Sequence, residues 1–121
     1  MKQRVVKWVG VALAVSLLVG LAVSAALAAQ PLVQILSPLD NAVVSGPTVP
    51  VTVDAVANKA NVRRVCLHAD RTLIYNSGSI SVAAFHQTVQ WNATPGRHYL
   101  TATAYDPYGN WSVARIWVTV Q

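Results

Sequence analysis

The chain has 121 residues, with nine Lys and Arg, four Asp, no Glu and a formal net charge of +5. Lys2, Arg4 and Lys7 supply three of the nine basic charges; the other six oppose four aspartates and leave a net charge of +2. A nucleic-acid interface needs a denser basic face, and the lack of Glu, a good helix former, disfavours long helices. The composition therefore argues against a nucleic-acid partner and a helical fold.

The first 29 residues have the three-part pattern of a secretory signal. A basic start is followed by an apolar run from Trp8 to Val23 and by Ala26-Leu27-Ala28, whose small residues suit a signal peptidase. We expect a signal peptide over residues 1–29, cut after Ala28 or Ala29, and one domain over residues 30–121. An uncleaved anchor is the alternative, because residues 8–29 are long enough to span a bilayer, which needs ~20 apolar residues. Both readings predict a secreted, extracellular or cell-envelope domain.

The rest of the chain alternates short apolar runs with turn residues. In the run 48–56, every second residue from Val49 to Ala55 shares one face. In the run 85–91, Phe85, Val89 and Trp91 face inward, and Gln87 shares their register. About seven antiparallel strands with no helical period predict an all-β sandwich. We expect strands at 32–36, 48–56, 62–69, 85–91, 97–105 and 113–120, short extended pieces at 43–44 and 73–75, and an ambiguous segment at 80–84.

These runs resemble bacterial immunoglobulin-like domains. The motifs that carry the resemblance are Val33-x-Ile35-x-Ser37-Pro38, Val62-x-x-Val65-x-Leu67-x-Ala69-Asp70, and Gly96-x-His98-x-Leu100-x-Ala102-x-Ala104-x-Asp106-x-x-Gly109-Asn110 after Trp91. The resemblance implies an immunoglobulin-like β-sandwich outside the cell or on its envelope, used for spacing, adhesion or binding. Two turn positions depart from the common pattern, with Asn92 in place of Asp and Arg71 in place of Gly.

Cys66 and His68 are the nearest approach to a catalytic pair. They lie two residues apart on one expected strand and so share a face, but no acid or oxyanion loop accompanies them. We expect a half-exposed thiol beside a solvated histidine and no enzymatic activity. Cys66 is also the only cysteine, which excludes an internal disulfide and leaves a free thiol or an intermolecular disulfide.

Metal ligands are scattered. The three histidines lie on different expected strands, without the closely spaced pairs that zinc sites use. Asp106 and Asn110 flank the last turn, but calcium takes ~6–8 oxygen ligands, and residues of this kind commonly bond their own backbone. We therefore expect no cofactor and no metal site.

The outer face of one sheet is the best candidate for a binding site. If Leu100, Ala102 and Ala104 face inward, the residues between them face outward, and the same holds on the two strands expected beside this one. Tyr, Trp and Arg are enriched at binding hot spots, and aromatic rings stack on sugars; cross-strand pairs that only stabilise the sheet are the alternative. The residues on this face are Tyr99, Tyr105, Trp117, Arg64, Arg115 and His68.

The sequence thus predicts an exported, non-enzymatic module that binds a protein or glycan at the cell surface, in an adhesive role. On this prediction, Trp117→Ala leaves the fold nearly intact and removes binding. The alternative is a purely structural envelope protein, tethered by its uncleaved N-terminal segment, that associates with itself. A disulfide through Cys66 would then make a homodimer. Membrane contact is expected only through residues 8–29, if they are uncleaved.

Overall fold

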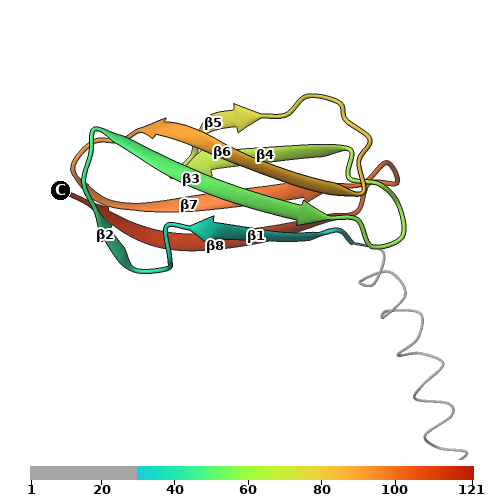
Figure 1. Cartoon of the computed structure of the whole chain (residues 1–121), viewed down its shortest axis with the longest axis horizontal. Helices are drawn as coiled ribbons and strands as arrows, with labels where there is room; N and C mark the ends of the chain where they lie inside the picture. Colours follow the sequence, from blue (N-terminus) through green and yellow to red (C-terminus); the bar gives the residue numbers. More distant parts are fainter. Residues whose placement is uncertain (1–29) are drawn as a thin grey trace, which may run out of the picture.

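The computed structural model describes residues 30–121, and the expected signal segment, residues 1–29, lies outside them. The described part is all-β, which confirms the fold prediction, and none of it is a helix long and apolar enough to cross a membrane. Figure 1 shows the eight strands: β1 (Leu32–Ser37), β2 (Ala42–Val44), β3 (Thr48–Val56), β4 (Arg64–Ala69), β5 (Thr72–Asn76), β6 (Ala84–Asn92), β7 (Gly96–Tyr105) and β8 (Trp111–Val120).

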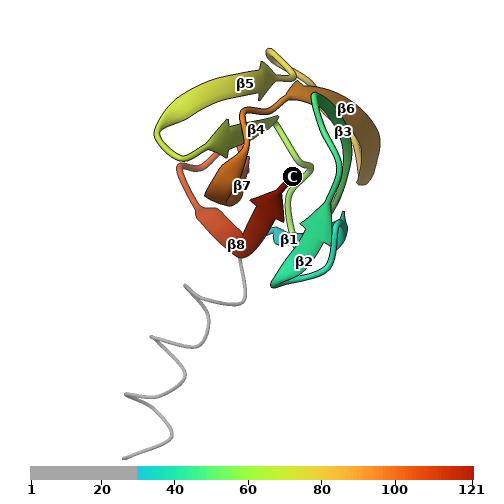
Figure 2. The same cartoon turned by 90° about the vertical axis from the view of Figure 1, so that its left-hand side faces the viewer.

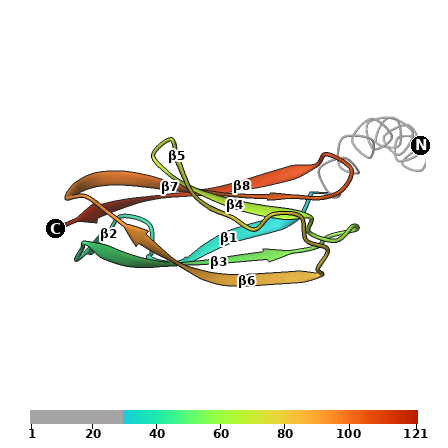
Figure 3. The ribbon, with the colours of Figure 1, turned by 90° about the horizontal axis from the view of Figure 1, so that it is seen from above.

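The strands form two sheets packed face to face (Figure 3). The three-stranded sheet has the order β1-β3-β6, and the five-stranded sheet has the order β2-β8-β7-β4-β5. All pairings are antiparallel except that of β2 with β8. Since β1 and β2 belong to different sheets, the chain crosses from one sheet to the other between them. Figure 2 shows β2 beside β8, at the end of the sandwich where the C-terminus lies.

The core lies between the sheets and follows the expected alternation. In β3 every second residue from Val49 to Ala55 is buried, and Leu67 and Leu100 are fully buried in the opposite sheet. Trp91 is buried in the core, as expected. Because full burial of such an aliphatic side chain contributes ~1.5–3 kcal/mol, this layer holds the domain together without a disulfide.

Three details differ from the expectation. β4 begins at Arg64, because Val62 instead forms an isolated bridge with Val82, within the segment that the sequence left ambiguous. Gln87 has the inward register opposite Val53 but is exposed, and its strand, β6, lies at the edge of its sheet. β8 begins at Trp111, two residues earlier than expected.

Candidate binding face

The six predicted residues lie on the outer face of the five-stranded sheet, on the three central strands β4, β7 and β8 (Figure 3). The core residues of these strands alternate with them, which fixes the face. The cross-strand register places the six residues, with two neighbours, at three levels across the sheet. Tyr99 is opposite Trp117. Thr101 lies between His68 and Arg115, and Tyr105 lies between Arg64 and Trp111.

Two aromatic rings and two arginines of this face, Arg97, Trp117, Tyr99 and Arg115, form one contiguous row. The ring centroids of Tyr99 and Trp117 are 5.4 Å apart, at an interplanar angle of 62°. The Cζ of Arg97 lies 4.7 Å from the Trp117 ring centroid, and that of Arg115 lies 4.9 Å from the Tyr99 ring centroid. The Arg115 Nε–H also donates to the Thr101 hydroxyl over 3.1 Å. The rings therefore hold two guanidinium groups in defined positions, through contacts of ~0.5–1 kcal/mol each at exposed sites.

No carboxylate neutralises these arginines. The four aspartates are engaged in other ways: Asp40 accepts the Trp117 backbone N–H, Asp54 pairs with His86, Asp70 pairs with His98, and Asp106 bonds within the β7–β8 turn. Within residues 30–121, the only ion pairs are those of the two histidines. Among the described residues, Arg97 and Arg115 therefore have no ion-paired carboxylate.

Two residues of this face were missed by the sequence reasoning. Arg97 shares its outward register with Tyr99 and could have been included, since it lies on the same predicted strand. Trp111 is 56% exposed opposite Tyr105, and it was missed because it follows the turn directly and the strand was expected to begin at Val113.

Cys66 faces outward, as predicted, but the expectation of a half-exposed thiol is wrong. The residue is only 7% exposed and lines a cavity of about 530 Å³, together with Arg63, Arg64 and Tyr105. Burial raises the pKa of the Cys66 thiol, while the positive charge of Arg64 acts in the opposite direction. A protonated, buried thiol is a poor nucleophile. The intermolecular disulfide stays a prediction, and the burial of Cys66 weighs against it.

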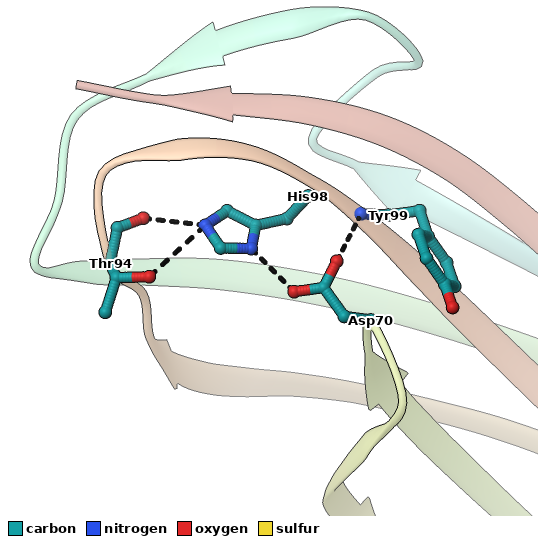
Figure 4. Close-up of polar contacts among 4 residues, drawn as sticks. All are labelled: Asp70, Thr94, His98 and Tyr99. Atoms are coloured by element: carbon teal, nitrogen blue, oxygen red, sulfur yellow. Dashed lines mark hydrogen bonds and ion pairs between the residues drawn. The ribbon is translucent and has the colours of Figure 1, made fainter.

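His98 closes the end of the sandwich near the C-terminus (Figure 4). Its Nδ1 lies 2.7 Å from the Asp70 carboxylate, in the β4–β5 turn, and its Nε2 lies 2.7 Å from the backbone oxygen of Thr94, between β6 and β7. The imidazole also meets the Trp91 ring edge to face, with centroids 5.2 Å apart. One side chain thus ties two turns to the core.

The protonation of His98 follows from these partners. A carboxylate and a backbone carbonyl are both acceptors, so both ring nitrogens must carry a proton to satisfy them. The hydrogen bond to Asp70 raises the pKa of His98, against the effect of burial, and the bond to Thr94 raises it further. The same contacts link the β4–β5 turn, through Asp70, to the β6–β7 turn, through Thr94.

Asp106 organises the β7–β8 turn at the opposite end. The residue is 3% exposed, and its carboxylate accepts the backbone N–H groups of Tyr108 and Asn110 and the Asn110 side-chain amide, over 2.8–2.9 Å. Gly109 supplies a φ of +84°, which favours glycine. Burial would raise the pKa of Asp106, but the hydrogen bonds from Asn110 and Tyr108 outweigh it and lower the pKa. Both oxygens are thus used by the turn, and residues 30–121 contain no group of three His, Cys, Asp or Glu side chains placed to hold a metal ion.

The two-sheet fold is that of an immunoglobulin-like β-sandwich. The family model described as a bacterial Ig domain matches residues 31–102, and the chain belongs to that family. Immunoglobulin-like and fibronectin III-like domains are generally non-catalytic and often extracellular or surface-associated. A comparison with curated proteins gave no significant match.

Similar solved structures support the fold. The fibronectin(III)-like modules of Clostridium thermocellum CbhA match with a TM-score of 0.61 at 21% identity, over 77% of this chain and 47% of that one. An engineered protein from the Northeast Structural Genomics Consortium matches with a TM-score of 0.53 at 27% identity, over 78% of this chain and 21% of that one. This chain therefore spans about half or less of the length of these two structures.

Proposed function

We propose that this chain is an exported binding module that recognises a protein or a glycan at the cell envelope, in an adhesive role. The ligand would contact the outer face of the five-stranded sheet. The observation that carries the proposal is the row of Arg97, Trp117, Tyr99 and Arg115, in which two guanidinium groups are fixed by ring contacts and lack a carboxylate partner. Membership of the bacterial Ig domain family supports a binding or structural role.

Cross-strand pairing of aromatic rings explains Tyr99 and Trp117 but does not explain the two arginines in this row. Tyr99 and Trp117 form a directly opposed aromatic pair that stabilises a sheet without any ligand. A pair of that kind needs no arginine on either ring. Two unpaired cations on one small face also repel each other in the free protein, and an anionic or polar ligand would relieve that repulsion.

The test is binding of the exported protein to cell envelopes isolated from the bacterium that expresses it. The Arg97→Ala/Arg115→Ala double variant is compared with wild type and with Lys59→Ala, which removes one exposed charge from the β3–β4 loop, away from the face. We expect the double variant to bind at least ~10-fold more weakly, because loss of two charge-assisted contacts costs more than ~1.4 kcal/mol. Lys59→Ala should bind like wild type, and circular dichroism checks that each variant is folded.

Unchanged envelope binding by the folded double variant would refute the proposal. Sedimentation of the same samples tests the structural alternative. A wild-type dimer that the double variant does not form would assign the face to self-association, and the exported module would then bind a second copy of itself.

A further inference from the structure

We infer that the ligand of this face is a linear acidic polysaccharide, a chain of sugar rings that carry carboxylates, lying along the strands over Arg97, Arg115 and Arg64. The inference rests on the proposed function and names its ligand class.

The backbones of the three arginines lie at successive levels along the sheet. Arg97 lies on β7, Arg115 is opposite Thr101 and Arg64 is opposite Tyr105. The guanidinium groups of Arg97 and Arg115 both lie against the Trp117–Tyr99 ring pair, which is level with position 99 of β7. Arg64 is level with position 105, six residues further along β7, which is roughly 20 Å at ~3.3 Å per residue. A ligand that reaches all three arginines must therefore extend along the strands, whereas a compact anion would reach only one end.

The three arginines Arg97, Arg115 and Arg64, with the side chains between them, form what we call the arginine stripe. This stripe presents guanidinium groups more than ring faces. Arg97 covers one face of Trp117, Arg115 covers Tyr99, and the two rings also contact each other. These two rings are therefore poorly placed to stack on a neutral sugar. A guanidinium group can instead bind a carboxylate through two parallel hydrogen bonds. The charge of the sugar is thus the feature that this part of the face is built to recognise.

The surface between the arginines suits a sugar chain. Thr101 and Thr119 place hydroxyl groups on the same face, level with Arg115 and Arg97. At the Arg64 end, Trp111 is 56% exposed, and no guanidinium or ring contact covers it among the described residues. That ring is free to stack on one sugar. The face therefore offers guanidinium groups, hydroxyl groups and one exposed ring across the neighbouring strands β8, β7 and β4.

An acidic peptide fits less well. Peptides that lie along sheets usually add a strand to a free edge and use main-chain hydrogen bonds. β7 is paired with β4 on one side and β8 on the other, so the stripe lies at the centre of the sheet, away from its edges. The face offers side chains only, which favours a ligand recognised through its charges and hydroxyl groups.

The experiment measures binding of the exported protein to polygalacturonate, with dextran as the neutral glycan and poly-glutamate as the acidic peptide. We expect polygalacturonate to bind, with an affinity that falls as salt rises, and dextran and poly-glutamate to bind much more weakly. Arg97→Ala, Arg115→Ala and Arg64→Ala should each weaken binding by about fivefold or more, since one charged hydrogen bond contributes ~1 kcal/mol or more. Lys59→Ala removes the same charge away from the stripe and should have little effect.

Two outcomes overturn the inference while the proposed function stands. Poly-glutamate could bind as tightly as polygalacturonate, or polygalacturonate could fail to bind while envelope binding still depends on Arg97 and Arg115. Equal weakening by Lys59→Ala and the stripe variants would also overturn it, because binding would then reflect net charge alone. If envelope binding is also independent of the arginines, the proposed function fails too.

Discussion

Trp117→Ala is expected to lower the free energy of unfolding by about 4 kcal/mol, contrary to the sequence-based expectation of a nearly intact fold. Trp117 is 41% exposed. Full burial of a large aromatic side chain removes up to ~250 Å² from water, so roughly 150 Å² of Trp117 is covered, worth at most ~3–4 kcal/mol at ~25 cal/mol per Å². Alanine retains a small part of this burial. Loss of the Tyr99 edge contact and the Arg97 contact adds ~0.5–1.5 and ~0.5–1 kcal/mol.

Trp111→Ala is the matched control, because it removes the same side chain from the same strand and face. Trp111 is 56% exposed and lacks such ring and guanidinium contacts, so we expect a loss of roughly 2 kcal/mol on the same area scale. Urea unfolding followed by circular dichroism measures both variants without relying on tryptophan fluorescence. Losses of equal size, or a larger loss for Trp111→Ala, would refute the assignment of ring and guanidinium contacts to Trp117. The expected loss is also the reason that the binding tests use arginine variants.

Three further predictions concern the turns and the thiol. The pKa of His98 is raised, so its contribution to stability is full below the ordinary value of 6.5 and is lost as the pH rises through the folded-state pKa; unfolding curves from about pH 6 to about pH 9 should show this decline, and Asp70→Asn should flatten it. The pKa of Asp106 is lowered, so its contribution is present above the ordinary value of 3.8 and is lost as the pH falls through the folded-state pKa; Asp106→Asn should remove this acid-dependent loss, and an unchanged acid profile would count against the turn hydrogen bonds. Cys66 should react with a thiol reagent more slowly than free cysteine near neutral pH and give no dimer on a non-reducing gel, whereas a Cys66-dependent dimer would show that the thiol is accessible.

The long strands were predictable because a period of two is a local signal. β3 buries every second residue from Val49 to Ala55, and β7 buries Leu100, Ala102 and Ala104 with the same period, although Thr103 is also buried. The short strands are different, because their state depends on a distant partner. Ala42–Val44 forms a strand because it pairs in parallel with β8, more than seventy positions later, and nothing in three residues indicates that pairing.

The candidate face was predictable in its membership but not in its contacts. Alternation decides which face a side chain takes, so the outward positions of Tyr99 and Trp117 followed from the buried Leu100. Alternation does not show how far the side chains on one face cover one another. Cys66 was therefore expected to be half-exposed although it is buried, and the arginines that lie over Tyr99 and Trp117 could not be foreseen.

The charge of this face and the stability of the domain have a common origin. Asp70 and Asp106 are used to fasten turns at the two ends of the sandwich, and Asp40 holds the β1–β2 crossing onto the backbone of Trp117. A small domain without a disulfide thus uses its few acids to hold its turns, which leaves the described arginines of the outer face without an ion-paired carboxylate. Because arginine stays protonated at all physiological pH values, the charge of the three arginines is constant while these acids titrate. His68 lies on the same face, level with Arg115, and histidine is itself titratable, so binding is best followed against pH in a His68→Ala variant. A loss of binding near the pKa of a uronic acid that this variant retains, measured where the domain is folded, would point to the carboxylates that the arginines hold.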